Sequence, residues 1–213
     1  MGAGIDCITW PKLLWPNGEV PVFVDDQLSP DIASRFQIPF SEACRHITES
    51  TKGLIKFQFL DGGSGSYLRV GHDMNGDPEG PYFSLLGRVG GQQPLNMPAK
   101  DVNRGRLLAT LLRALGLCPE HVRSDRDKFI KINYSAVTSG MEYMFEARDE
   151  PRGTRAYGTF DFESVMMVGA NYASANGISP TIEALTPRTW PGTESKTSLS
   201  AGDIATLKSI YGS

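Results

Sequence analysis

The side chains best suited to chemistry lie between residues 107 and 123, which read LLATLLRALGLCPEHVR. Arg113 is a permanent cation. Held at a fixed point, a guanidinium can bind a carboxylate, an enolate or a polarised carbonyl oxygen. Thr110 lies on the same stretch, and Tyr157 in RAYGTFDF adds a hydroxyl that can donate a hydrogen bond. The alternatives are an Arg113 paired with a nearby acid and a purely structural Tyr157.

Histidines and cysteines are too sparse and scattered to predict a metal site. The chain has three of each: His46, His72, His121, Cys7, Cys44 and Cys118. A catalytic zinc site takes three protein ligands and an open position. Cys118 has no histidine beside it in the pattern that would make it a nucleophile. We therefore expect no metal ion and no cofactor.

Composition excludes several classes of function. A chain of 213 residues is long enough for one sizeable core. A net charge of −3 gives no basic surface for nucleic acid. No run approaches the roughly 18 apolar residues of a membrane span. The opening MGAGIDCITW lacks a signal-peptide pattern, and the cysteines are few and odd in number, which favours a reducing, cytoplasmic location.

Hydrophobic periodicity predicts an α+β order of elements. The leucines from 107 to 115 recur at helical spacing, and Gly116 suits the end of that helix. The remaining expected elements are a turn followed by a strand within 15–26, strands at 54–60 and 66–70, two short strands within 82–97, and helices at 30–49 and 201–211.

Five segments resemble, in the right order, the astacin-type zinc peptidases, which are metzincins of the zincin fold. They read WPNGEVPVFVDD, LLGRVGGQQPLNM, HVRSDRDKFIKIN, FDFESVMMV and SLSAGDIATLKSIYG. The resemblance implies a two-lobed domain over 15–213 after an extension of 1–14. Its N-lobe, about 15–118, would hold a twisted, mostly antiparallel sheet and two long helices. An irregular C-lobe, about 119–213, would complete a cleft.

The departures from this family fall on its chemistry. The metzincin pattern is H-E-x-x-H-x-x-G-x-x-H. Anchored on Gly116, its histidines fall on Ala109, Arg113 and Pro119, and its glutamate falls on Thr110. In the segment that holds the family's Met-turn, Met166 keeps the methionine. The histidine and tyrosine that follow it in the family are replaced by Met167 and Val168. The resemblance thus implies a member without zinc ligands or catalytic base.

The former active site is the predicted ligand site. We expect Arg113, Tyr157 and Thr110 to act on a ligand. We expect its lining to include Ala109, Leu112, Pro119, Glu120, Met166, Met167 and Val168. In the family the glutamate at position 120 receives the freed N-terminus. Here Glu120 could instead pair with Arg123 or Arg126, or lie exposed.

Two functions stay open at this point. The cleft could bind and transform a small apolar molecule without a metal, by a cyclisation or an isomerisation. Alternatively, a non-catalytic pseudoprotease could bind a peptide or protein through the cleft or the edge strand, expected around 92–97. A structural or assembly role is a third hypothesis, whose sign would be a large exposed apolar patch.

Overall fold

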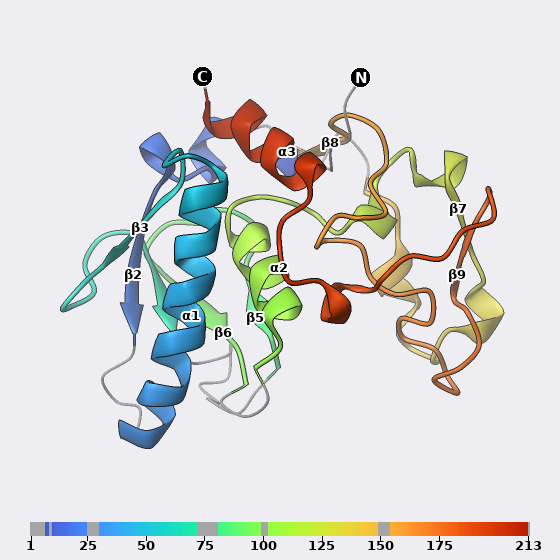
Figure 1. The fold of residues 1–213 in the computed structure, drawn as a ribbon, viewed down its shortest axis with the longest axis horizontal. Helices are drawn as coiled ribbons and strands as arrows, with labels where there is room; N and C mark the ends of the chain where they lie inside the picture. The colour runs from blue at the N-terminus through green and yellow to red at the C-terminus, as the bar shows by residue number, and fades with distance from the viewer. Residues whose placement is uncertain are drawn as a thin grey trace.

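The fold comes from a computed structural model, which describes residues 7–8, 10–24, 30–71, 81–98, 102–148 and 154–212, with backbone only for 30–36. Its largest sheet has five strands in the order β3-β2-β4-β6-β5 (Figure 1). The bounds are β2 Glu19–Val24, β3 Lys56–Phe59, β4 Tyr67–Val70, β5 Phe83–Ser84 and β6 Gln92–Asn96. Val20 and Val22 are fully buried, as their alternation predicts.

The prediction of a mostly antiparallel sheet is wrong. Strand β2 pairs in parallel with β3 and β4, and β4 pairs in parallel with β6. Only β5 runs antiparallel, against β6. A parallel pair needs a crossover connection, and the long helix between β2 and β3 supplies one. Short alternating strands do not show this direction in the sequence.

Two helices pack beside each other against this sheet (Figure 1). They are α1, Pro30–Ser50, and α2, Arg104–Ala114. Helix α2 begins at Asn103, whose side chain accepts a hydrogen bond from the Arg106 amide. It stops before Gly116, whose φ of +102° is a left-handed value that favours glycine. The predicted core face is confirmed, since the five leucines of this segment are buried: Leu107, Leu108, Leu111, Leu112 and Leu115.

A third helix, α3, spans Ala201–Tyr211, as the sequence predicts. Ser200 and Asp203 form a capping box at its start. It runs past one end of α1 (Figure 1). Leu207, on its inner side, joins the same core cluster as the α2 leucines.

The first residues described are part of the packed domain. Strand β1, Cys7–Ile8, is buried and pairs with β8, Thr154–Arg155. The amide of Ile8 also donates to the carbonyl of Gly116 over 2.9 Å. The boundary at residue 14 stays a prediction, but Cys7 and Ile8 do not project away as an extension would.

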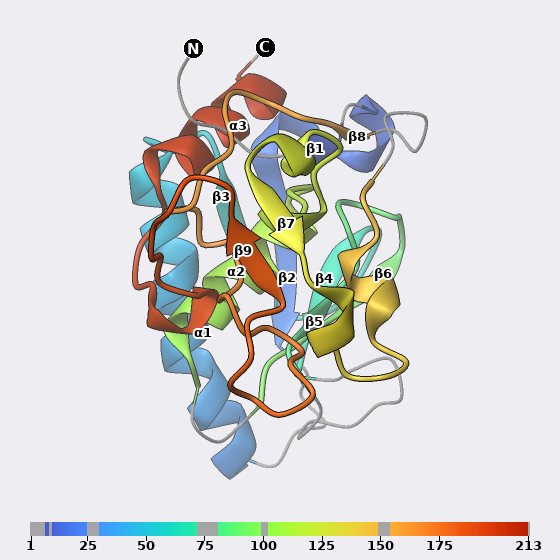
Figure 2. The same ribbon diagram turned by 90° about the vertical axis from the view of Figure 1, so that its right-hand side faces the viewer.

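The C-terminal part is mostly irregular, as expected. Its two-stranded sheet pairs β7, Ile130–Ile132, with β9, Ile182–Ala184, seen side by side in Figure 2. Phe145, Phe160 and Met167 belong to a second hydrophobic cluster here.

Short 3-10 turns occur in both parts of the chain. They lie at Pro11–Leu13, Pro16–Gly18, Glu120–Val122, Arg126–Lys128, Tyr134–Ala136, Glu142–Phe145 and Thr193–Ser195.

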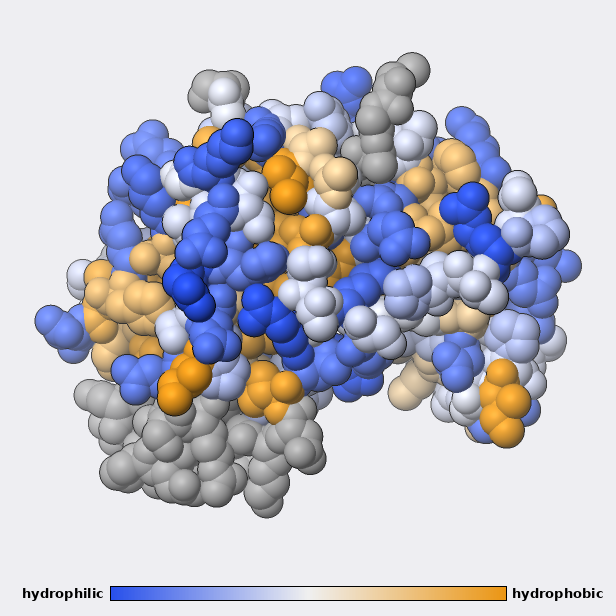
Figure 3. Space-filling model, viewed as in Figure 1, coloured by the Kyte–Doolittle hydropathy of each residue, from blue (hydrophilic) through white to orange (hydrophobic). Residues whose placement is uncertain are grey.

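The two clusters do not divide cleanly at residue 118, because Val165 and Met166 belong to the first one. None of the helices in the described ranges is long and apolar enough to cross a bilayer. No disulfide joins the three cysteines, all of which are buried. On the face drawn in Figure 3, apolar side chains reach the surface in separate groups among polar ones.

Candidate active site

A cleft of about 740 Å³ lies between the sheet and the irregular part. Its lining comes from two parts of the chain. The earlier part contributes residues within 81–84 and 106–113, and the later part contributes residues within 119–122, 143–148, 166–172 and 193–194. Strand β5 and helix α2 therefore face the irregular segments across one concave surface. A cleft of this size is within the range of small-molecule sites.

Six of the ten predicted residues line this cleft: Ala109, Thr110, Arg113, Pro119, Met166 and Val168. Ala109 and Arg113 are one helical turn apart, so they share the cleft-facing side of α2. Pro119 follows the end of this helix, and Met166 and Val168 come from the Met-turn segment. Their functional roles stay predictions.

The other four residues do not line the cleft. Leu112 is fully buried in the core, because it lies about 100° around α2 from Arg113, towards the side that carries the other buried leucines. Met167 is fully buried in the second cluster, against which the neighbouring Val168 also packs. Tyr157 is exposed at 39%, away from the cleft. Its contact with Arg123 is made by the backbone carbonyl oxygen, which accepts a hydrogen bond from Arg123 Nη1, and not by the hydroxyl.

Glu120 is also misplaced in the prediction, because it is fully buried in an ionic network below the cleft. Its Oε1 accepts hydrogen bonds from Arg123 Nη1 at 3.0 Å and from the Asp161 amide at 2.5 Å. Asp125 holds the other side of Arg123. Burial raises the pKa of Glu120, and Arg123 offsets part of that effect. Of the alternatives left open by the sequence, the pairing with Arg123 is the one observed.

Arg113 is held against the sheet edge by a hydrogen bond. Its Nε donates to the carbonyl oxygen of Ser84 over 3.1 Å. The Ser84 hydroxyl in turn donates to the carbonyl of Thr110 over 2.8 Å, so β5 and α2 are joined twice. Burial, and then the charge of Arg148, lower the pKa of Arg113. Among the described residues no carboxylate lies within 4.0 Å of Arg113.

Thr110 contributes little chemistry of its own. Its hydroxyl donates to the carbonyl of Arg106 over 2.8 Å, a bond within the helix. The side chain is nearly buried. The proposed catalytic role of Thr110 therefore rests on position alone.

The sequence reasoning missed several polar residues of the cleft. Arg148 and Tyr172 line it from irregular segments, where no periodic pattern marks a residue's direction. Arg106 lines it too, but it already pairs with Glu194 at 2.9 Å. The hydroxyl of Tyr172 has a long contact of 3.8 Å with Met144 Sδ. Burial raises the pKa of Tyr172, which keeps the hydroxyl protonated.

His121 lines the cleft as a neutral imidazole. Its Nε2 lies 3.2 Å from the carbonyl of Met144, a geometry that makes Nε2 the protonated donor. Its buried Nδ1 has no hydrogen-bond partner in the described ranges. Burial lowers the pKa of His121 to about 4. The ring lies 5.5 Å from that of Tyr172.

The floor of the cleft at Met166 is fixed from below. Lys196, which is buried, donates from Nζ to the carbonyls of Phe162, Ser164 and Met167. The Ser164 hydroxyl donates to Asp203 over 2.6 Å. One cation and one carboxylate thus stabilise the turn, whose own side chains are largely apolar.

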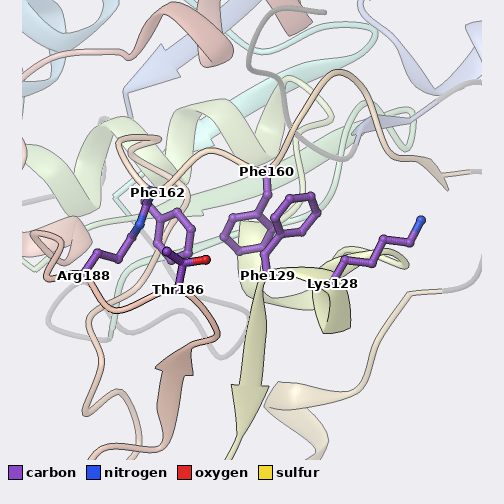
Figure 4. A pocket seen from close by; sticks show the side chains of 6 residues that line it. All are labelled: Lys128, Phe129, Phe160, Phe162, Thr186 and Arg188. Carbon is purple, nitrogen blue, oxygen red and sulfur yellow. The ribbon is translucent and has the colours of Figure 1, made fainter.

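A second, smaller pocket of about 190 Å³ lies in the C-terminal part, on the side of Phe129, Phe160 and Phe162 (Figure 4). The rings of Phe129 and Phe160 stack at 5.1 Å, and the guanidinium of Arg188 lies 4.6 Å from the centre of Phe162. This pocket contains none of the residues singled out in the sequence. The part of the chain that the structure describes holds no group of three or more His, Cys, Asp or Glu able to bind a metal.

Comparisons with known proteins agree on one family. The chain is 28% identical over 203 residues to zinc metalloproteinase nas-13 of Caenorhabditis elegans, covering 93% of this chain and 41% of that protein. It is 30% identical over 174 residues to astacin-like metalloprotease toxin 1 of Loxosceles intermedia, covering 78% of this chain and 58% of the toxin. It therefore spans less than two thirds of the length of these two curated relatives.

A solved structure has the same fold. High choriolytic enzyme 1, a hatching-enzyme zinc protease of the medaka Oryzias latipes, superimposes with a TM-score of 0.75 at 22% identity, over 93% of this chain and 92% of that one. The astacin-like α+β fold predicted from the sequence is thereby confirmed. The family model of the astacin peptidases matches residues 8–212. This chain is a member of the astacin family.

Proposed function

We propose that this astacin-family chain is proteolytically inactive and binds a small organic molecule in its cleft without a metal. The observation that carries the proposal is the position of Ala109, Arg113 and Pro119. The resemblance in sequence aligns all three with the family's zinc-binding histidines, and all three line the cleft. An alanine and a proline side chain offer no donor atom, and a guanidinium repels a dication.

Peptide hydrolysis needs more than the metal. The family's glutamate, which takes the proton of the attacking water, aligns with Thr110, whose hydroxyl is bound to the Arg106 carbonyl. The tyrosine of the Met-turn segment aligns with Val168. Thr110 cannot act as a general base at pH 7, and Val168 has no hydroxyl to stabilise an oxyanion.

The form of the sheet edge supports a small molecule over a peptide. The strand expected at the edge, around residues 92–97, is β6, and β5 covers it. The strand next to the cleft is β5, which is two residues long. Its Ser84 carbonyl already accepts a hydrogen bond from Arg113. Adding a peptide strand requires main-chain groups that are open to a partner, and here little edge remains for one.

The same geometry suits metal-free chemistry on a bound carbonyl compound. Ala109, Met166 and Val168 give the ligand an apolar surface, and Arg113 supplies one oriented cation. Such a site can fold a flexible substrate and stabilise a developing enolate in a cyclisation or an isomerisation. The second candidate is a non-catalytic pseudoprotease that binds a peptide in this cleft.

Two measurements test the proposal. Purified protein is incubated with zinc, desalted and analysed for metal, and hydrolysis of casein and fluorogenic peptides is followed. We expect no bound zinc and no cleavage; a stoichiometric metal with peptide turnover would overturn the proposal. Methyl-labelled methionine NMR then locates binding. Small-molecule fragments should shift Met166, while Met97 in the core stays unchanged. Shifts from peptides but not from fragments would favour the second candidate.

A further inference from the structure

Two arginines line the cleft and have no carboxylate partner among the residues that the structure describes. Arg113 comes from α2 and Arg148 from the segment that follows Phe145. No acid within the described ranges lies within 4.0 Å of either guanidinium. Other arginines at or below the cleft are paired: Arg106 with Glu194 at 2.9 Å, and Arg123 with Glu120 at 3.0 Å. Arg113 and Arg148 differ from these paired arginines, because an incoming anion can neutralise their charges.

A hydrogen bond holds the Arg113 side chain, and a backbone hydrogen bond ties down the segment that carries Arg148. Arg113 uses its Nε for the Ser84 carbonyl, and no described residue takes its two terminal amino groups. The amide of Arg148 donates to the carbonyl of Val122 over 2.7 Å, which ties this segment to the 3-10 turn Glu120–Val122. The charge of Arg148 also contributes to the lowered pKa of Arg113, so the two cations repel each other. Two like charges in a partly buried cleft destabilise the empty protein.

The groups around this pair indicate an organic anion. Tyr172 lines the same cleft, and burial raises the pKa of its hydroxyl. This hydroxyl makes a long contact with Met144 Sδ. The charge of Arg113 offsets part of the rise that burial causes in the pKa of Tyr172. Beside them lie the apolar side chains of Ala109, Met166 and Val168. Glu146 and Glu194 also line the cleft, and they would repel a dianion more strongly than a monoanion.

We propose that Arg113 and Arg148 together bind the carboxylate of an amphipathic ligand, with Tyr172 as a further hydrogen-bond donor and the apolar tail of the ligand on Ala109, Met166 and Val168. A carboxylate accepts the parallel hydrogen bonds that a guanidinium offers. This inference rests on the ligand-binding function proposed above and names the class of ligand.

The test compares matched probes by isothermal titration calorimetry. Decanoate, decanamide and decyl phosphate share a chain and differ in the head group. Decanoate should bind wild type best. Arg113→Met and Arg148→Met should each weaken it by roughly tenfold to a hundredfold and leave decanamide unchanged. Arg113→Lys keeps the charge but loses the two parallel donors of the guanidinium. Its affinity for decanoate should therefore lie between those of wild type and Arg113→Met. Arg45→Met is the matched control, since that side chain is exposed on α1, pairs with Glu49 and does not line the cleft, and it should change decanoate affinity by less than about threefold.

The outcomes separate this inference from the function on which it rests. Equal binding of decanoate and decanamide, unchanged by either variant, would overturn the carboxylate assignment while leaving a ligand-binding cleft. Tighter binding of decyl phosphate would overturn it in favour of a phosphate. If no probe shifts the Met166 methyl signal, both the inference and the ligand-binding function fail. Circular dichroism of each variant checks that a lost affinity is not a lost fold.

Discussion

The Nε of Arg113 donates to the carbonyl oxygen of Ser84 over 3.1 Å, which joins helix α2 to the edge strand β5. The bond fixes a cation where the family resemblance places a zinc-binding imidazole. It also occupies a main-chain acceptor next to the cleft. One residue therefore bears on two parts of the proposed function, which are the lack of a bound metal and the preference for a small molecule over a peptide strand.

Replacing Arg113 tests whether it is kept for folding or for a ligand. We expect Arg113→Met to leave the free energy of unfolding unchanged or to raise it by up to about 1 kcal/mol. It removes a partly buried cation that lacks a carboxylate, and the lost bond to Ser84 contributes only about 1 kcal/mol. Urea unfolding measures the change.

The matched control is Arg123→Met, which strands the buried Glu120 and should lose about 3–5 kcal/mol. A loss of more than about 2 kcal/mol in Arg113→Met would show that Arg113 is a structural residue.

Local signals made much of this fold predictable. Pro30, the Ser200–Asp203 capping box and Gly116 mark helix ends by their own backbone chemistry, and the observed helices begin or end there. Strand direction was not predictable in the same way. The parallel pairing of β2 with β3 depends on how α1 crosses between them, which is a property of packing and not of either strand.

In the candidate site, too, the residues on a regular helix were predictable and those on irregular segments were not. Helical spacing placed Ala109 and Arg113 on one side of α2, and both line the cleft. Arg148 and Tyr172 come from segments without regular structure, so no period indicates where their side chains point. Met167 and Val168 show the same limit, because one of two adjacent residues is buried in the second cluster and the other lines the cleft.

Restoring the metal ligands tests whether the family's geometry persists. The quadruple variant Ala109→His, Thr110→Glu, Arg113→His, Pro119→His should bind one zinc ion, because α2 keeps the first two imidazoles one turn apart and position 119 lines the same cleft. Zinc titration against a chromophoric chelator measures affinity.

The double variant Ala109→His, Arg113→His, with two ligands, is the comparison and should bind at least about tenfold more weakly. Equal affinities would mean that position 119 no longer reaches the metal.

Helix α2 is seated on the segment around Thr193 through Gly105. A Cβ on Gly105 would lie 1.9 Å from the Thr193 carbonyl oxygen and 2.6 Å from that of Lys196. Gly105→Ala should therefore lose about 2 kcal/mol or more, although alanine is normally the better helix residue by about 1 kcal/mol. The control is Gly62→Ala, where a Cβ would meet nothing within 4 Å. Thermal unfolding compares the two, and a Gly105→Ala variant as stable as the control would contradict the packing seen here.

Acid should destabilise the protein through His121. Its pKa is lowered from 6.5 to about 4 by burial. Between these values the unfolded chain binds a proton that the folded protein does not, so stability is lost as the pH falls from 6.5 towards 4. The shift corresponds to roughly 3 kcal/mol.

The His121→Gln variant keeps a donor for the Met144 carbonyl but does not titrate. Its free energy of unfolding, followed by urea titration from pH 7 to pH 4, should fall less steeply than that of wild type. Carboxyl groups such as Glu120 titrate in both proteins, so their contribution cancels in the difference. Parallel curves would mean that the folded imidazole takes up its proton at the ordinary pH, and that His121 is not the neutral group in the cleft.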